Sequence, residues 1–410
     1  MATTVLSMSG TSIKMLNYCL KNDVCVHGMK TGFTGASLRR LSMYLKHSCH
    51  KTKKESLCTA KVRSHGLPYL GQRFKGRQAE KDLNSPSTHP YTLVENHLNG
   101  ITCRIKQDLK AIDHELLHVS EYYFDGQGKL FRPMLIMLMA KAANFHETQM
   151  DRLLASQEKI AMIAEMIHTA SLMHDDVIDA ADSRRGKPSI NQVWGQRKAI
   201  IGGDFVMAMA SIELARIRNE DVVSVVAQIT EDLVRGEFMQ LGSKEREEER
   251  FTHYLNKSFK KTASLLANSC KAVAILGQCD EGVEEVAFEY GKNIGISFQL
   301  IDDLLDFTSC DHVMGKPTAA DLKLGLATAP VLFAAKKYPE LNAMIMRRFT
   351  EEGDVETARQ LVAKSDGVAE TRELAQNHSR EAVRQIHTLT NSKYTTALER
   401  VADMVLSRNK

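Results

Sequence analysis

The chain has 410 residues, and its 43% of apolar residues are enough to form a large buried core. It contains no uninterrupted run of eighteen apolar residues, so no membrane-spanning helix is predicted. The net charge of +4 combines a strongly basic segment at residues 1–79 with an acidic remainder, in which 40 Lys and Arg stand against 48 Asp and Glu. An acidic globular part argues against a helical nucleic-acid-binding protein.

Residues 1–85 are predicted to be a targeting and linker segment. The first 79 residues hold fourteen Lys and Arg but only Asp23 and Glu55 as acids, and they are rich in Ser and Thr. This composition is typical of a mitochondrial transit region, here followed by a disordered linker, and it predicts a location in the mitochondrial matrix. A basic tail that binds nucleic acid or an anionic membrane is the competing interpretation, but the segment lacks a dense block of Lys and Arg.

From residue 90 onward the sequence predicts one all-α domain that extends over residues 90–410. Apolar residues recur at helical spacing, proline is scarce, and no alternation typical of paired strands is present. We expect a bundle of about ten or more helices around a central cavity, because bundles build ligand sites between facing helices. The cysteines form no C-x-x-C pair, which predicts neither a disulfide framework nor a zinc site.

A basic motif, G-K-L-F-R-P, opens this domain at residues 128–133. Lys129 and Arg132 are three residues apart and share one face near the start of a predicted helix, where anions bind readily. On its own, the motif does not separate a binding site from an ordinary helix start.

Two acidic runs of the form D-D-x-x-D occupy residues 175–179 and 302–306. Asp175 and Asp179 are four residues apart, as are Asp302 and Asp306, so each pair shares a helix face. Like charges at this spacing repel, and Mg²⁺ relieves the repulsion by binding one or two carboxylates together with substrate phosphate oxygens. The alternative is a solvated helix face. Both runs interrupt apolar helical patterns, which favours the metal site.

Further basic residues lie near both acidic runs. Arg184 and Arg185 follow the first run, Lys261 and Thr262 lie on a later helical pattern, and Lys316 comes ten residues after the second run. Simple charge balancing is the alternative for the arginine pair. Cations around both runs favour two diphosphates, one held through Mg²⁺ and one held directly by Lys and Arg.

Together these motifs resemble those of the trans-isoprenyl diphosphate synthases, from about residue 100 to the C-terminus, and most closely the long-chain polyprenyl branch. The family's G-K-x-x-R-P is matched at 128–133, and its two aspartate-rich helices are matched at 165–179 and 298–306. The resemblance implies the isoprenoid synthase fold, Mg²⁺ as cofactor, and sequential condensation of isopentenyl diphosphate onto an allylic diphosphate (farnesyl or geranylgeranyl). The implied product is the precursor of the ubiquinone side chain.

The resemblance also implies a role for each candidate residue. Mg²⁺ would be bound by Asp175, Asp179, Asp302 and Asp306. The allylic leaving group would be held by Arg184, Lys261 and Lys316, with Thr262 and Gln299 at the reacting centre. The diphosphate of isopentenyl diphosphate would be bound by Lys129, Arg132, His168 and Arg185. For His168, which lies two helical turns before Asp175, a buried structural histidine is the alternative.

Small residues before the first acidic run predict a long product. Ala170 and Ser171 lie about one helical turn before Asp175, where aromatic side chains would cap a short product tunnel and small ones leave it open. Met207 fits either a tunnel wall or an ordinary core.

Two positions depart from the family pattern: Leu326 stands where many members have the lysine of D-L-x-x-G-K, and Gln127 replaces a glycine. The first change removes a phosphate contact unless Lys323 supplies it. Animal long-chain synthases are similar in having a second, degenerate subunit, which implies a hetero-oligomer with at most peripheral membrane contact. The alternatives are a non-catalytic or regulatory subunit, which the intact D-D-x-x-D pairs disfavour, and a terpene cyclase or head-to-head synthase, which the site for isopentenyl diphosphate disfavours.

Overall fold

The computed structural model describes residues 88–408 except 111–112, 127, 243–245 and 309–318. The predicted transit region and linker, Gln127 and Lys316 therefore lie outside the described residues. The all-α prediction is confirmed, with well over ten helices in the described part of the chain. The helices before residue 243 are α4 (Pro90–Leu98), α5 (Ile101–Asp108), α6 (His114–Glu121), α7 (Phe131–Thr148), α8 (Ala155–Ile178), α9 (Ile190–Trp194), α10 (Gln196–Ile217) and α11 (Glu220–Gly242).

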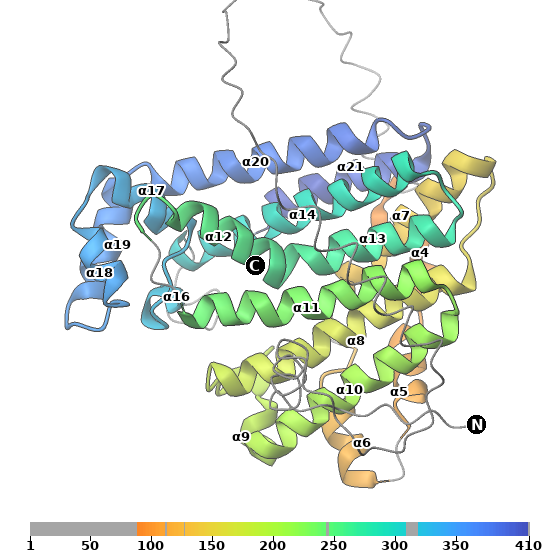
Figure 1. The fold of residues 1–410 in the computed structure, drawn as a ribbon, viewed down its shortest axis with the longest axis horizontal. Helices are drawn as coiled ribbons and strands as arrows, with labels where there is room; N and C mark the ends of the chain where they lie inside the picture. The colour runs from red at the N-terminus through yellow and green to blue at the C-terminus, as the bar shows by residue number, and fades with distance from the viewer. Residues whose placement is uncertain (1–87, 111–112, 127, 243–245, 309–318, 409–410) are drawn as a thin grey trace, which may run out of the picture. The chain divides into compact units, whose positions relative to one another are not determined.

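The later helices form the upper part and the left-hand end of the bundle in Figure 1. They are α12 (Arg250–Ser258), α13 (Ser264–Leu276), α14 (Glu281–Thr308), α16 (Ala320–Lys323), α17 (Ala329–Lys337), α18 (Leu341–Met346), α19 (Asp354–Lys364), α20 (Gly367–Ile386) and α21 (Lys393–Leu406). α14 packs between α13 and α20, and α8 packs on α7, α10 and α13. The two helices that carry the acidic runs, α8 and α14, are therefore both interior helices, as predicted.

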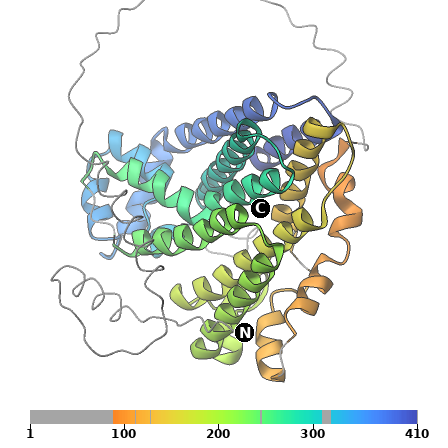
Figure 2. The same cartoon turned by 45° about the vertical axis from the view of Figure 1, so that its right-hand side comes forward.

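The periphery of the bundle closes it on two sides. α4 packs on α7, and α6 packs on α10, so these early helices run along one edge in Figure 2. At the opposite end, a small second apolar cluster holds α16, α17, α18 and α19 together; it includes Leu322, Val331, Leu341 and Phe349. This cluster positions the segment that follows the second acidic run.

The helical pattern that contains Lys261 and Thr262 is not a uniform α-helix. Between α12 and α13 the chain forms the π-helical turn η2 (Phe259–Ala263). Such single π turns within helices occur frequently at functional sites. The sequence gives no signal for this turn, because its residues suit an α-helix equally well.

Close helix packing around η2 depends on two glycines. A Cβ atom on Gly295 of α14 would lie 2.5 Å from the Cα atom of Ala263, and a Cβ on Gly236 of α11 would lie 2.9 Å from the backbone nitrogen of Lys261. Neither approach is possible for a larger residue without a backbone shift. The glycines therefore bring α11 and α14 against η2 from two sides.

The loop after the first acidic run is a short β-hairpin, which the sequence did not predict. Strands β1 (Ser183–Arg184) and β2 (Lys187–Pro188) pair antiparallel, and the connecting Arg185 and Gly186 both have positive φ angles of 54° and 77°. Two consecutive positive φ angles are the geometry of a tight two-residue hairpin turn. A positive φ is uncommon for arginine, so this turn holds the Arg185 side chain in a defined direction at some backbone cost.

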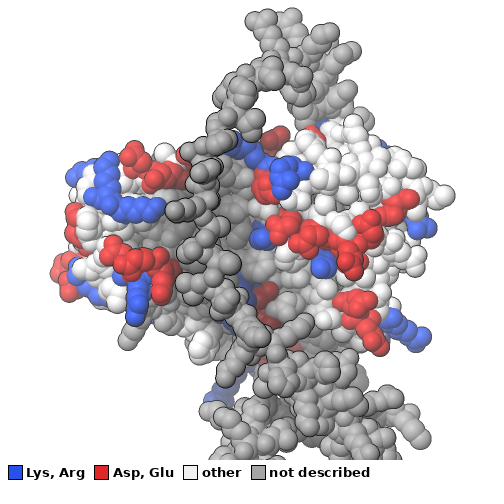
Figure 3. All heavy atoms as spheres, turned by 45° about the horizontal axis from the view of Figure 1, so that its top comes forward, with Lys and Arg blue, Asp and Glu red and all other residues white. Residues whose placement is uncertain are grey.

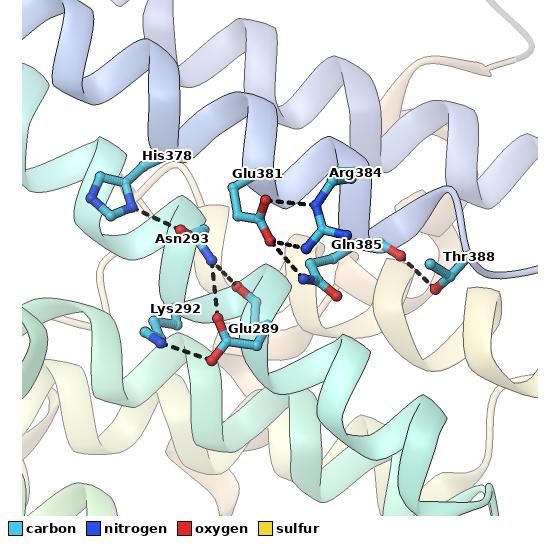
Figure 4. A network of polar contacts seen from close by, with 8 residues as sticks. All are labelled: Glu289, Lys292, Asn293, His378, Glu381, Arg384, Gln385 and Thr388. Atoms are coloured by element: carbon cyan, nitrogen blue, oxygen red, sulfur yellow. Dashed lines mark hydrogen bonds and ion pairs between the residues drawn. The ribbon is translucent and has the colours of Figure 1, made fainter. Parts of the chain in front are cut away.

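Polar contacts join α14 to α20 at a distance from the acidic runs. The imidazole of His378 on α20 lies 2.7 Å (Nδ1 to Oδ1) from Asn293 on α14, whose amide donates to the backbone oxygen of Glu289 (Figure 4). Because the Asn293 oxygen can only accept, His378 Nδ1 carries the proton. This contact orients the two longest helices of the upper layer.

The described surface carries both signs of charge. On the face drawn in Figure 3, Lys and Arg side chains are interspersed with Asp and Glu side chains. None of the described helices is both long enough and apolar enough to span a bilayer.

Candidate active site

A cavity of about 400 Å³ lies between α8, α10, α11 and η2. Its wall contains six residues that the sequence marked as candidates, namely Arg132, His168, Ser171, Asp175, Lys261 and Thr262. A second cavity of about 310 Å³ shares Met207 and Thr230 with the first, and its wall is otherwise almost entirely apolar. A cavity lined by both charged and apolar residues thus adjoins an almost entirely apolar one, with Met207 in the wall of both.

The first acidic cluster (Asp175, Asp176 and Asp179) lies at the C-terminal end of α8. Burial raises the pKa of Asp175 to about 6, with Glu237 and Asp179 acting in the same direction and Lys261 opposing them. Burial and Glu237 also raise the pKa of Asp179. The helix C-terminus adds further negative potential. Two outer carboxylates therefore share a negatively charged environment in which Lys261 is the main compensating cation.

The middle carboxylate of this cluster has a different role. Asp176 is fully buried, and it accepts hydrogen bonds from the Arg184 guanidinium at 2.8 Å (Nε) and 2.5 Å (Nη2) and from the Tyr123 hydroxyl. The backbone N–H of Ile190 in turn donates to Tyr123 at 2.9 Å. Asp176 therefore ties α8 to the hairpin. Arg184 is engaged with a protein carboxylate here, and its role toward a diphosphate stays a prediction.

The second acidic cluster (Asp302, Asp303 and Asp306) lies near the end of α14. Its middle carboxylate, Asp303, is buried and accepts hydrogen bonds from Tyr254 at 2.5 Å and from Gln299 at 2.8 Å. Burial raises the pKa of Asp303 to about 6, although these two hydrogen bonds act against the shift.

Both outer carboxylates of the second cluster have protein partners. Asp302 forms an ion pair with Arg408 at 2.8 Å, and that guanidinium also lies 3.9 Å from the centre of the Phe298 ring. Asp306 accepts the backbone N–H groups of Ala320 at 3.0 Å and Asp321 at 3.2 Å, at the start of α16. Hydrogen bonds and ion pairs from the chain itself therefore compensate the carboxylates of the second cluster more fully than those of the first.

The three catalytic candidates on η2 and α14 lie together. Lys261 donates to Glu237 at 2.6 Å, and Asp175, Glu237 and Asp179 together raise its pKa despite the opposing effect of burial. Thr262 donates to the side-chain oxygen of Gln299 at 2.7 Å. Because the Gln299 amide donates in turn to Asp303, a hydrogen-bonded chain links η2 to the second acidic cluster.

Three of the candidates for the second diphosphate site, Arg132, His168 and Arg185, lie close enough to act on one another electrostatically. A Cβ on Gly128 would lie 3.2 Å from an Arg185 guanidinium nitrogen, so the hairpin turn packs against the G-K-x-x-R-P motif. Burial, and then Arg132 and Arg185, lower the pKa of His168 well below its ordinary value, so the imidazole is neutral. The Nε atom of Arg132 is buried without a hydrogen-bond partner in the described structure. An anion with several oxygens would satisfy these donors.

Some candidates are placed differently from the others. Lys129 is exposed, and Ala170 is fully buried in the apolar core. Ser171 lines the larger cavity, whereas Ala170 is in the wall of neither of the two cavities described above. Sequence reasoning did not identify Glu165, whose pKa is raised by burial while Arg132 and Arg185 lower it. It also did not identify Tyr123, Tyr254, Glu237 or Arg408, because single residues far away in the sequence carry no motif.

The donor set at the acidic clusters fits a hard divalent cation that is bound jointly with a diphosphate. Among the described residues, no group of three or more His, Cys, Asp or Glu side chains is arranged to hold a metal ion by itself. Mg²⁺ uses one or two protein carboxylates together with water and phosphate oxygens, and the raised pKa values of Asp175 and Asp179 mark an excess of negative charge.

Comparisons with known proteins agree with this site. The family model described as polyprenyl synthetase matches residues 113–362, more than half of the chain. The sequence is 58% identical over 323 residues to the human all trans-polyprenyl-diphosphate synthase PDSS1, covering 79% of this chain and 78% of that protein. It is 45% identical over 343 residues to decaprenyl-diphosphate synthase subunit 1 of Schizosaccharomyces pombe, covering 78% and 91%.

Two further matches concern location and ligands. The probable hexaprenyl pyrophosphate synthase, mitochondrial, of Neurospora crassa is 37% identical over 424 residues, covering 92% of this chain and 94% of that protein. The crystal structure of a Caulobacter crescentus polyprenyl synthase, complexed with calcium and isoprenyl diphosphate, superposes with a TM-score of 0.71 at 28% identity, covering 79% of this chain and 98% of that one.

The chain belongs to the polyprenyl synthetase family. The relatives confirm the predicted enzyme class, a trans-prenyltransferase, and the solved structure confirms the predicted isoprenoid synthase fold.

Proposed function

We propose that the chain is the catalytic subunit of a Mg²⁺-dependent, long-chain polyprenyl diphosphate synthase of the mitochondrial matrix. It would add isopentenyl diphosphate repeatedly to an allylic diphosphate, either farnesyl or geranylgeranyl diphosphate, and so make the precursor of the ubiquinone side chain. One observation carries the proposal: Asp175 and Lys261 both line a cavity that adjoins an almost entirely apolar cavity, and Asp179 acts electrostatically on the same lysine. This arrangement suits a substrate with a charged head and a growing hydrocarbon tail.

The allylic diphosphate would bind between the two acidic clusters. Mg²⁺ bound there would neutralise the charge that develops on the departing diphosphate. Lys261 supplies a fixed cation at the same place, and the neighbouring carboxylates keep it protonated because they raise its pKa. The hydrogen-bonded chain from Thr262 through Gln299 to Asp303 would hold the reacting centre in one geometry.

Isopentenyl diphosphate would bind among Lys129, Arg132, His168 and Arg185. The neutral His168 can donate one N–H to a phosphate oxygen, while the arginines supply charge and paired donors. The alkene of isopentenyl diphosphate would attack the allylic carbon. The diphosphate released from the allylic substrate would accept the proton that is lost. The apolar chamber would serve to exclude water, which would otherwise trap the allylic cation.

Two features support a second, synthase-like subunit. An exposed apolar strip follows α10 and α11, with Phe238 77% exposed, Val234 64% exposed and Ile201 57% exposed. Exposed apolar surface of this extent on neighbouring helices is typical of a contact surface. Val234 and Phe238 also line the larger cavity, so a partner that covers the strip would complete its wall. The name of the fission yeast relative, a subunit 1, agrees with this proposal.

A non-catalytic or regulatory subunit is the second candidate function, and Leu326 is the observation that favours it. The test is a product assay on the full chain with labelled isopentenyl diphosphate, farnesyl diphosphate and Mg²⁺, alone and with a mitochondrial lysate. Long polyprenyl product from the chain alone supports a catalytic subunit, and product only when the chain is added to a lysate depleted of this protein shows that a partner is required. If a lysate depleted of this protein gives the same product with and without the chain, the catalytic assignment is wrong.

A further inference from the structure

Lys257 on α12 is a cation without an anionic partner in contact. Within the described part of the chain its ammonium makes no hydrogen bond or ion pair, and it lies 5.6 Å from the centre of the Tyr254 ring. The other two lysines of this stretch, Lys260 and Lys261, are each paired with a carboxylate at 2.6 Å. The Lys257 side chain is half-buried and lines a cleft, so its ammonium is available to an anionic ligand.

The Lys257 ammonium faces the second acidic cluster. Lys257 is close enough to Lys261 for the two ammonium groups to act on each other electrostatically. Its neighbour Tyr254 donates to Asp303 at 2.5 Å. Asp303 and Asp321 both act on the Lys257 ammonium electrostatically, although burial outweighs them and lowers the pKa of Lys257. The ammonium therefore lies between Lys261 and the end of α14.

Leu326 lies in the wall of the same small cleft as Lys257 and Tyr254. The position of this segment is fixed, because Asp306 accepts two N–H groups at the start of α16 and the Leu326 N–H donates to the Asp321 backbone oxygen at 2.9 Å. The residue that replaces the family lysine and the uncompensated lysine of α12 thus occupy one cleft, although 69 positions of sequence separate them.

We propose that Lys257 binds the allylic diphosphate and supplies from α12 the positive charge that Leu326 no longer supplies. This inference rests on the proposed function. The charge has moved from the segment after α14 to the helix before η2, and the ligand is the same diphosphate. The departure at Leu326 is then a relocation of a phosphate contact and not its loss.

The test measures binding of inorganic diphosphate to the full chain by calorimetry, with Mg²⁺ present and isopentenyl diphosphate saturating so that only the allylic site reports. Lys257→Met is expected to weaken binding roughly tenfold to a hundredfold, the range for a hydrogen bond between charged groups. Lys257→Arg should bind within about threefold of the natural chain, and Leu326→Lys added to Lys257→Met should restore at least half of the lost affinity, on a logarithmic scale. Lys336→Met, which removes the same charge from an exposed position on α17, should have no effect.

The outcomes separate the two proposals. If the natural chain binds no diphosphate under these conditions, the proposed function fails. If it binds and Lys257→Met binds equally well, or if Leu326→Lys restores nothing while both variants keep the natural melting temperature, the relocation is wrong. If the Lys257→Met chain does not fold, Lys257→Arg and the single Leu326→Lys variant decide. Full diphosphate binding by Lys257→Arg together with tighter binding by Leu326→Lys supports the relocation. Unchanged binding by Leu326→Lys contradicts it.

Discussion

The two acidic clusters are built on the same plan at their centres. In each, the middle carboxylate of D-D-x-x-D is buried and accepts a hydrogen bond from a tyrosine hydroxyl that comes from a distant segment. Tyr123 donates to Asp176, and Tyr254 donates to Asp303. The middle aspartates therefore hold the helices in place.

The outer carboxylates distinguish the clusters. Asp302 is paired with Arg408, and Asp306 accepts two backbone N–H groups, so the chain itself compensates much of the second cluster. Asp175 and Asp179 instead face each other and Glu237, with Lys261 as the main cation. The two clusters share the same five-residue motif, but the first depends more strongly than the second on bound cations for compensation of its negative charge.

The largest expected effect is at the first cluster. Asp175→Asn should lower the rate of product formation by about a thousandfold, because it removes a ligand for the charge that stabilises the departing diphosphate. The melting temperature should stay the same or rise, since a carboxylate in a negative environment is removed. Asp204→Asn, at an exposed acid nearby on α10, is the matched control and should retain activity. Near-normal turnover of Asp175→Asn would remove Asp175 from the metal site.

The neighbouring Asp176 should behave in the opposite way. Asp176→Ala leaves the Arg184 guanidinium and the Tyr123 hydroxyl without their buried partner, so the free energy of unfolding should fall by about 3–5 kcal/mol. Urea denaturation of the two variants side by side measures the contrast. An Asp176→Ala chain as stable as the natural one would show that the middle carboxylate has no structural role.

Removing each tyrosine hydroxyl tests whether the hydrogen bonds to the two middle carboxylates contribute equally to stability. Tyr254→Phe removes one hydrogen bond to a carboxylate and should cost about 1.5–3 kcal/mol of stability. Tyr123→Phe should cost at least as much, because Tyr123 also accepts the Ile190 N–H. The measurement is the free energy of unfolding in urea. The larger loss in Tyr254→Phe would contradict this ranking.

Substitutions at two adjacent residues of α8, the helix that carries the first cluster, should differ in their effect on product length. Ser171→Phe places an aromatic ring in the cavity wall and should shift the labelled products to shorter chains. Ala170→Phe overfills the core and should mainly cost about 1–3 kcal/mol of stability. Chromatography of the products and thermal melts of both variants give the comparison. If Ser171→Phe leaves the product distribution unchanged, the cavity does not hold the growing chain.

The smallest effect is expected at His378 on α20, which contacts α14 away from its acidic cluster. Burial, and then Lys292, lower the pKa of His378. The unfolded chain therefore takes up this proton at a higher pH than the folded chain, so stability falls as the pH drops from about 6.5 toward the lower folded value. In His378→Gln the difference between urea midpoints at pH 7.5 and 5.5 should be smaller, with the contact to Asn293 retained. An unchanged difference would mean that other groups set this pH dependence.

The elements that the sequence predicted are those with a local signal. α8 and α14 are long, apolar and without proline, so their type and interior position followed from periodicity, and the D-D-x-x-D spacing placed Asp175 and Asp302 on them. Thr262 and Gln299, which the resemblance assigns to one reacting centre, are hydrogen-bonded to each other, and their role there stays a prediction. The roles of Ala170 and Ser171 could not be separated, because a difference of one residue rotates a side chain by about 100° and the exact helix orientation depends on packing.

The features that the sequence did not predict depend on contacts between distant segments. Tyr123 lies 53 residues before Asp176, and Tyr254 lies 49 residues before Asp303. Arg408 reaches Asp302 from the other end of the domain. The glycine of the Arg185–Gly186 turn is a local sequence signal for a turn. It was not recognised because the surrounding sequence has a helical pattern.

The π turn η2 has a consequence for tolerance of insertions and deletions. It accommodates one residue more than an α-helical path, so the extra residue is absorbed within the turn itself. A chain shorter by one residue here would form an uninterrupted α-helix in which α12 and α13 keep their relative phase, so Tyr254 would still point at Asp303. The residues of the turn, Lys261 and Thr262 among them, would instead be rotated away from Glu237 and Gln299. A single-residue deletion would thus leave both D-D-x-x-D runs and their helices in place and would displace the side chains that lie between them.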